Sequence, residues 1–400
     1  MRQLLTGLIL CGLCAACTGT SPMITPEMPP EVRSSWGEIQ TITSAELTDA
    51  PALAIQNGQA MLAWRGRDAA GIRHYAATSS INPTILSLEA FTSFGYTLIT
   101  AAPGHFHLLW IDTAENESIL RLQSAYINEN AVAELGINPL STGQTYHYDA
   151  IPDTAGGLHI AWTADLPDEP TLYTSRIDAA GRIGVPSRIL DNVTMPALSL
   201  ASDGALYVTW HREDTIWQGI LRKTEIIDAR PILDMPLLND GDRLNAFHSA
   251  LDSTHQYLFW QIIRADGSPE TWWSQRPLNT PDWQPITRLT IFTDGTIPVE
   301  NPGYNMGTVF KPDSNPQPVT WASPLIGQHS PLAVAVSTPQ QNIGILLLQS
   351  GQIIGYQTVL ENTLLLRPPV IMTDPDKHLY LAWSEIADDL KMHLNITSTR

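Results

Sequence analysis

The most regular feature of this chain is an apolar run that ends in tryptophan and then turns polar. One copy reads ALYVTWHRED at residues 205–214. Similar runs place tryptophan at positions 64, 110, 162, 210, 260, 321 and 383, roughly 45 to 60 residues apart. A period of this size, built from strand-like segments, is typical of a β-propeller, whose repeating unit is a four-stranded blade.

Each repeat also predicts the other strands of a blade. In the repeat around Trp210, an apolar run at 196–203 is followed by the turn Asp203-Gly204 and then by the tryptophan strand. Asp-Gly favours a tight hairpin because glycine tolerates a left-handed backbone. Two further alternating runs complete a unit, as at 171–178 and 186–191 in the preceding repeat.

The tryptophans are expected to pack between blades. Side chains alternate along a strand, so Leu206, Val208 and Trp210 share one face. Tyr207 and Thr209 share the other face, and both faces are mostly apolar. A second strand covered on both sides by neighbouring blades would have this pattern. We therefore interpret the rings as core material rather than as platforms for sugar stacking.

The register is ambiguous between residues 291 and 367. In the preferred interpretation, 331–367 form a complete blade without a tryptophan, 291–328 are an inserted loop, and Trp321 marks no blade. In the other, Trp321 marks the sixth blade and 342–360 form an extra hairpin. Both give seven blades, and an eighth would require the insertion to form hairpins of its own.

The end of the chain predicts how the ring closes. After Trp383 only one further strand fits before Arg400. Residues 37–44 alternate correctly, and we expect them to supply the missing strand and cover an edge that would otherwise invite aggregation. The sequence thus predicts an all-β fold: a seven-bladed β-propeller of four-stranded antiparallel blades over residues 36–400, closed by an N-terminal strand in the C-terminal blade.

The N-terminal segment carries all three cysteines, at positions 11, 14 and 17. Arg2 precedes an apolar stretch at 4–16 that is too short to span a bilayer, and Ala15 and Ala16 precede Cys17. This segment resembles a bacterial lipoprotein signal peptide; a secretory signal with chance cysteines is the alternative. The resemblance implies removal of 1–16, lipidation of Cys17, a flexible tether at 17–35, and an extracytoplasmic location on the cell membrane or outer membrane.

Charge and composition narrow the partners. The formal net charge of −18 disfavours nucleic acid and anionic lipid head groups, and no basic patch offsets it. A chain that begins at Cys17 would lack thiols for disulfides or thiolate metal sites. NDGDR at 239–243 lacks the terminal Glu of a Ca²⁺ loop, and no phosphate-binding loop is present. We expect no metal, no cofactor and a monomer.

Candidate binding residues gather where propellers usually bind ligands. The loops after the second strands and those that enter the next blade emerge on one face. After the tryptophan strands come Arg65, Arg67, Asp68, Asp112, Asp165, His211, Arg212, Glu213 and Arg264. The loops that enter the next blades add His147 and His248, together with Tyr146, Tyr148 and Asn245.

The predicted function is a non-catalytic module that binds a protein or glycan on this face; the alternative is a glycoside hydrolase. SDGALYVTW at 202–210 faintly resembles the Asp-box of sialidase-like propellers. That resemblance would imply an arginine cluster for a substrate carboxylate, drawn from Arg65, Arg67, Arg212 and Arg264. It would also imply a nucleophile pair formed by Tyr146 or Tyr148 with Glu213.

Overall fold

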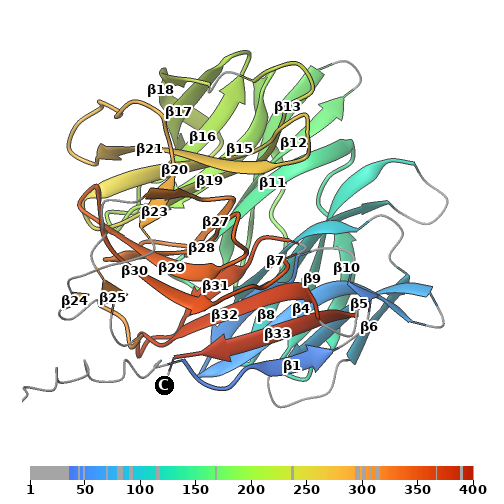
Figure 1. Ribbon diagram of the computed structural model, residues 1–400. Coiled ribbons are helices and arrows are strands. Elements are labelled where there is room, and N and C mark those ends of the chain that lie inside the picture. Colours follow the sequence, from blue (N-terminus) through green and yellow to red (C-terminus); the bar gives the residue numbers. More distant parts are fainter. Residues whose placement is uncertain are drawn as a thin grey trace, which may run out of the picture. The chain divides into compact units, whose positions relative to one another are not determined.

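The tryptophan repeats fold into four-stranded antiparallel sheets in the computed structural model of the protein (Figure 1). The structure describes residues 36–43, 46–47, 50–68, 71–78, 84–89, 93–113, 118–166, 169–235, 238–292, 298–299, 303–306, 309–310, 316–365, 367–387 and 391–399. Seven sheets form the blades of a β-propeller, which confirms the predicted fold class; each blade has four strands, and further short strands extend the sheets of two blades.

The first four blades follow the chain in order. Blade one contains β3 (Ala52–Gln56), β4 (Gln59–Asp68), β5 (Gly71–Thr78) and β6 (Thr84–Glu89), and β2 (Glu46–Leu47) pairs with the far end of β4. Blade two contains β7 (Phe94–Thr100), β8 (His105–Thr113), β9 (Leu120–Asn128) and β10 (Ala133–Pro139). Blade three contains β11 (Gln144–Pro152), β12 (Leu158–Leu166), β13 (Glu169–Ile177) and β14 (Ser187–Asp191). Blade four contains β15 (Thr194–Leu200), β16 (Leu206–Arg212), β17 (Thr215–Arg222) and β18 (Glu225–Asp234).

The last three blades complete the ring. Blade five contains β19 (Arg243–Leu251), β20 (His255–Ile263), β21 (Pro269–Pro277) and β22 (Thr287–Arg288). Blade six contains β27 (Trp321–Pro324), β28 (Leu332–Ser337), β29 (Ile343–Gln349) and β30 (Gln352–Leu360). Blade seven contains β31 (Val370–Thr373), β32 (Leu379–Ile386), β33 (Met392–Ser398) and β1 (Gln40–Thr43). The first strand of each blade contacts the first strands of both neighbours, so these seven strands surround the centre.

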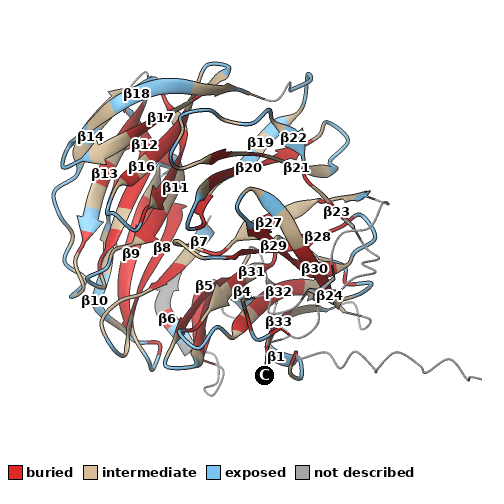
Figure 2. Ribbon diagram, turned by 90° about the vertical axis from the view of Figure 1, so that its left-hand side faces the viewer, coloured by how far each residue is buried: buried red, intermediate tan, exposed pale blue. Residues whose placement is uncertain are grey.

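Alternation along the second strand gives each blade two apolar faces. In β4, Leu62 and Trp64 belong to a buried cluster shared with blade seven. Met61 and Ala63, on the opposite face of the same strand, belong to a cluster shared with blade two. Figure 2 shows buried residues on second strands such as β8 and exposed residues on outermost strands such as β18. The core therefore consists of layers between blades.

Six of the seven marker tryptophans are core residues. Trp64, Trp110, Trp162, Trp210, Trp260 and Trp383 lie on second strands and are buried almost completely. This confirms that they pack between blades, where each ring removes roughly 200 Å² of surface from water. Trp321 differs, because it is only partly buried and lies on a first strand.

Blade six departs from both sequence interpretations. Residues 331–367 supply three of its strands, not four, and its second strand β28 has no tryptophan. Its first strand is β27, which pairs with β28 and lies within the expected insertion 291–328. The short strand Trp321–Pro324 is too brief to show a period-two pattern, which is why the sequence did not reveal it. The rest of the insertion includes β23 (Thr290–Phe292), paired with β26 (Pro316–Pro318), and β24 (Pro298–Val299), paired with β25 (Val309–Phe310).

The ring closes as predicted. Strand β1 pairs antiparallel with β33, and Figure 1 shows the two side by side near the C-terminus. The Thr41 hydroxyl donates to Asn395 Oδ1 at 2.8 Å, and the Gly37 amide donates to the Ser398 carbonyl at 2.7 Å. The N-terminal strand thus covers the open edge of the last blade.

The predictions for the extreme N-terminus concern residues that the structure does not describe. Residues 1–35, which include Cys17, the expected signal peptide and the tether, lie outside the described residues. Within the described part of the chain, no helix has the length and hydropathy of a membrane span.

Candidate functional site

A central pocket opens where the first residues of four inner strands converge. Strands β7, β11, β15 and β19 supply most of its wall, and its volume is about 570 Å³. Inner strands begin on the face where second strands end, which is the face that the sequence predicted to be functional. The pocket is the size of a site for a small molecule or a few sugar units.

The inner strands are irregular at this pocket. Each shifts register by a β-bulge there: between Phe94 and Thr97 in β7, Thr145 and His147 in β11, Thr194 and Ala197 in β15, and Leu244 and Ala246 in β19. Bulges re-aim side chains and occur often beside active sites. Here Tyr146 and Asn245 are the extra residues of their bulges, and both line the pocket.

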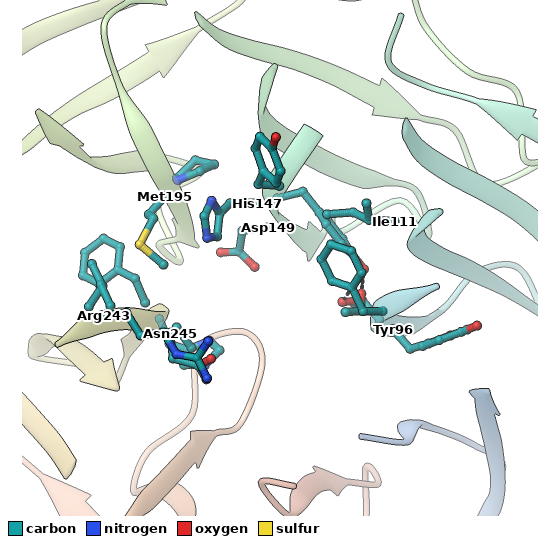
Figure 3. A pocket seen from close by; sticks show the side chains of 17 residues that line it. Tyr96, Ile111, His147, Asp149, Met195, Arg243 and Asn245 are labelled. Carbon is teal, nitrogen blue, oxygen red and sulfur yellow. Dashed lines mark hydrogen bonds between the residues drawn. The ribbon is translucent and has the colours of Figure 1, made fainter. Parts of the chain in front are cut away.

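Four polar side chains face the pocket without protein partners. Tyr146, His147, Arg243 and His248 make no side-chain hydrogen bond or ion pair to any residue that the structure describes. Figure 3 shows His147 on one side of the cavity and Arg243 with Asn245 across from it. Tyr146 is 47% exposed, so its hydroxyl group is accessible to a ligand. Such side chains are available to bind a ligand or transfer a proton.

Burial keeps both imidazoles of the pocket neutral. Desolvation lowers the pKa of His248 to about 4 and also lowers the pKa of His147. A neutral imidazole has one nitrogen that can accept a proton at neutral pH. Each ring can therefore accept a proton, and the pKa of about 4 makes His248 a weak base.

Asp149 is the carboxyl group in the wall of the central pocket. Burial raises its pKa to about 7, against the opposing effect of two backbone hydrogen bonds. Its Oδ1 accepts the Ala150 amide at 2.9 Å and its Oδ2 accepts the Leu198 amide at 2.6 Å. Because Leu198 belongs to β15, Asp149 also ties blade three to blade four. Near neutral pH a substantial fraction of this group is protonated.

Two of the eleven residues predicted to bind ligand line the central pocket, namely His147 and His248. Two others lie together at the junction of blades one and two. The Ser93 hydroxyl donates to Asp112, and Arg65 donates to the Ser93 carbonyl at 3.2 Å. His74 lies 3.5 Å from the Asp112 carboxylate, and the group is buried.

The remaining predicted residues do not converge. Arg264 is held by Asp242 at 2.7 Å and Glu270 at 2.6 Å. Arg212 donates to the Asp191 carbonyl at 2.9 Å and lies over the Trp217 ring. None of the residues Arg65, Arg67, Asp112, Asp165, His211, Arg212, Glu213 and Arg264 lines the central pocket. The side chain of Asp68 lies outside the described residues.

The arginine cluster implied by the sialidase resemblance is therefore not assembled. Tyr148 lines the central pocket, but its hydroxyl donates to the Gly95 carbonyl and also lies 3.1 Å from the Leu109 carbonyl. Glu213 is exposed on the turn between β16 and β17. The side chains that do converge come from inner strands, whereas the sequence analysis emphasised the segments that follow the tryptophans.

Arg243 and Asp149 are site residues that the sequence analysis missed. A signal for them exists in the polar and aromatic openings of inner strands, TYHYD at 145–149 and RLNAFH at 243–248. These openings interrupt the apolar pattern expected of an inner strand.

One group of potential metal ligands occurs among the described residues, on the turn from β31 to β32. Ligand atoms of Asp374, Asp376 and His378 lie within 4.8 Å of one another. His378 Nδ1 already contacts Asp374 Oδ2 at 3.0 Å. Asp374 and His378 are thus already hydrogen-bonded to each other.

Known structures share this fold. No protein-family model matches the sequence, and no curated protein matches it significantly. The polysaccharide lyase Uly1 superposes with a TM-score of 0.57 at 7% identity, covering 91% of this chain and 98% of the lyase. A polysaccharide lyase of family PL25, an ulvan lyase bound to -[GlcA(1-4)Rha3S]-, superposes with a TM-score of 0.53 at 10% identity, covering 90% of this chain and 95% of the lyase.

These comparisons correct the predicted function. We expected a non-catalytic binding module. These two structures, which share this fold over nearly their full length, are instead polysaccharide lyases. At such low identity the likeness itself shows the fold, a β-propeller similar to those of polysaccharide lyases.

Proposed function

We propose that this protein is a carbohydrate-active enzyme that cleaves an acidic polysaccharide by β-elimination in the central pocket. The observation that carries the proposal is the set of unpartnered side chains there: two neutral imidazoles, an exposed phenol and an arginine. The shared fold with polysaccharide lyases supports it.

The residues have distinct roles in such a reaction. Arg243 and Asn245 bind the uronate carboxylate and stabilise the negative charge that develops on it when the adjacent carbon loses its proton. His147 or His248 accepts that proton from C5. The C4–O bond breaks as the C4=C5 double bond forms, and the Tyr146 hydroxyl protonates the departing glycosidic oxygen. No water is consumed.

The products provide the test. Purified protein is incubated with a panel of uronate-containing polysaccharides, with neutral polysaccharides as controls. β-Elimination leaves an unsaturated uronate, seen as ultraviolet absorbance that grows with the number of new reducing ends. New reducing ends without that absorbance would indicate hydrolysis, and no cleavage of any acidic polymer would refute the proposal.

The buried carboxyl group of Asp149 is the observation that supports glycoside hydrolysis as a second candidate function. A carboxyl group with its pKa raised to about 7 is suited to donate a proton to a glycosidic oxygen. Hydrolysis ordinarily needs a second carboxylate, and among the described residues Asp149 is the single carboxyl group that lines the central pocket. Lyase chemistry therefore fits the described residues better, and the product assay above decides between the two.

We also propose that the enzyme is a lipoprotein anchored through Cys17 on the outside of a membrane. The support is the sequence that precedes Cys17, an apolar stretch ending in small residues. Expression of the full chain in a bacterium with radiolabelled palmitate should label the wild type and leave Cys17→Ser unlabelled. Equal labelling of both would contradict the anchor without affecting the proposed reaction.

A further inference from the structure

A second cavity, here called the lateral cavity, lies between blades four and five. Its volume is about 560 Å³, and it shares no lining residue with the central pocket. Its wall includes Tyr207, at the start of β16, and residues 278–281, which follow β21. Second strands begin and third strands end on the face opposite the central pocket, so the two cavities belong to opposite faces.

Arg276 is the main charged group of the lateral cavity. Its residue is only 3% exposed. Its guanidinium carbon lies 5.3 Å from the centre of the Tyr207 ring and 5.5 Å from the centre of the Trp283 ring. Nε donates to Gln256 Oε1 at 3.1 Å, and Nη1 donates to the Thr280 carbonyl at 2.9 Å. All of these partners are neutral.

A buried hydrogen-bond network fixes the guanidinium in this position. Gln256 Oε1 also accepts from Gln218 Nε2 at 2.9 Å. Gln256 Nε2 donates to the hydroxyls of Ser199 at 3.1 Å and Ser249 at 3.0 Å. With both ends of its amide engaged, Gln256 cannot rotate freely. Arg276 is therefore preorganised before any ligand arrives.

The charge of Arg276 is not compensated by the protein. No carboxylate in the described part of the chain forms an ion pair with it, and Arg230 contributes a second positive charge to the cavity. Burial is the main factor that lowers the pKa of Arg276, and repulsion from Arg230 adds to it. Asp228 also lines the cavity, but it is exposed and forms no ion pair with Arg276. A buried cation with neutral partners alone is costly, so an anionic ligand would be strongly favoured.

We propose that the lateral cavity binds the oxyanion of an acidic sugar, a carboxylate or a sulfate ester, between Arg276 and Arg230. A guanidinium matches either oxyanion through paired N–H donors. The volume exceeds that of a bare ion and accommodates a sugar ring, and the Asn279 and Thr280 side of the wall is polar. The site does not depend on the reaction proposed for the central pocket.

Binding is tested by calorimetric titration of glucuronic acid, glucose 6-sulfate, inorganic sulfate and glucose. All proteins in this titration carry Arg243→Ala, which removes the cation of the central pocket, so that the remaining binding reports on the lateral cavity. The protein with this substitution alone is called the parent. The parent is compared with Arg276→Met, with Arg230→Ala, and with Arg222→Ala as a matched control, since Arg222 is exposed on β17 and does not line the cavity. Circular dichroism verifies folding.

At least one acidic sugar should bind the parent, and Arg276→Met should weaken it by about tenfold or more. Arg230→Ala should weaken it by a smaller factor without disturbing the buried network, and Arg222→Ala should leave it unchanged. Absence of binding by both acidic sugars, or equal binding in the Arg276 and Arg230 variants and the parent, would overturn the proposal. Binding of inorganic sulfate alone, or of glucose equally well, would refute the assignment to an acidic sugar.

Discussion

At the scale of single residues, position determines what a histidine can do. A histidine in water titrates near neutral pH, but His248 lines the central pocket, where burial lowers its pKa to about 4. The same effect lowers the pKa of His147, three residues from the start of its strand. Neither effect can be read from the sequence, because the burial that lowers each pKa is created by strands far apart in the chain.

Removal of either imidazole tests their proposed roles. His147→Ala and His248→Ala should each lower kcat for an acidic polysaccharide, the general base by about 10²- to 10⁴-fold. His159→Ala is the matched control, since His159 is also half-buried with a lowered pKa but does not line the central pocket. Initial rates of product absorbance provide the measurement. Full activity in both pocket variants would place the reaction elsewhere.

The pKa of His248 also predicts a pH dependence of stability. Below about pH 6.5 the unfolded chain binds a proton at this site, whereas the folded chain binds it only near pH 4. The free energy of unfolding should therefore fall as the pH decreases from about 6.5 to about 4, by about 3 kcal/mol from this group. His248→Asn should lose that component. Urea titrations at several pH values measure it, and parallel curves for variant and wild type would show that burial does not affect this histidine.

At the scale of strands and blades, the alternation of side chains along each strand determines where the core and the pocket form. It sends Leu62 and Trp64 towards one neighbouring blade and Met61 and Ala63 towards the other, so no blade has a core by itself. Where a bulge interrupts the alternation, as at Tyr146 and Asn245, side chains turn into the central pocket instead. Regular segments build the scaffold, and irregular ones build the site.

A comparison of Trp260 with Trp321 tests whether burial, and not position in a sequence repeat, determines how much a tryptophan stabilises the fold. Trp260 is fully buried on a second strand, whereas Trp321 is partly exposed on the first strand of blade six. Trp260→Ala should lower the free energy of unfolding by about 3–5 kcal/mol, and Trp321→Ala by less than about 2 kcal/mol. Denaturant titrations measure both. Equal losses would mean that the ring of Trp321 supports the fold as much as the marker tryptophans do.

At the scale of the whole molecule, the net charge of the protein repels the proposed substrate. The chain carries a formal net charge of −18, and an acidic polysaccharide is also negative. Attraction at Arg243 acts over a short distance, whereas the repulsion acts at long range and is screened within about 10 Å at 0.1 M salt. Association should therefore be limited by repulsion at low ionic strength.

Moderate salt should accordingly accelerate the proposed reaction. We expect KM for an acidic polysaccharide to fall by a factor of about two or more between roughly 10 mM and 150 mM sodium chloride, with kcat nearly unchanged. A neutral oligosaccharide that the enzyme cleaves or binds provides the control and should show little change. A KM that rises with salt would indicate that local positive charge outweighs the net charge.

Much of the architecture was available in the amino-acid pattern. Tryptophans at a regular period and runs that alternate every second residue predict blades, because backbone geometry and burial act locally and repeat with each unit. The closing strand at 40–43 was predictable for the same reason, since the last unit lacked a strand and this segment alternates. Strand β27 was not, because four residues give too little pattern.

The pocket depended on contacts between distant parts of the chain. His147 and His248 lie 101 positions apart in the sequence. They line the same pocket only because the first strands of different blades surround one centre. The four arginines after the tryptophan strands looked equivalent, yet Arg264 is neutralised by Asp242 and Glu270. Local pattern specifies which face of a strand is buried, but desolvation and ion pairing depend on neighbours that only the closed ring supplies.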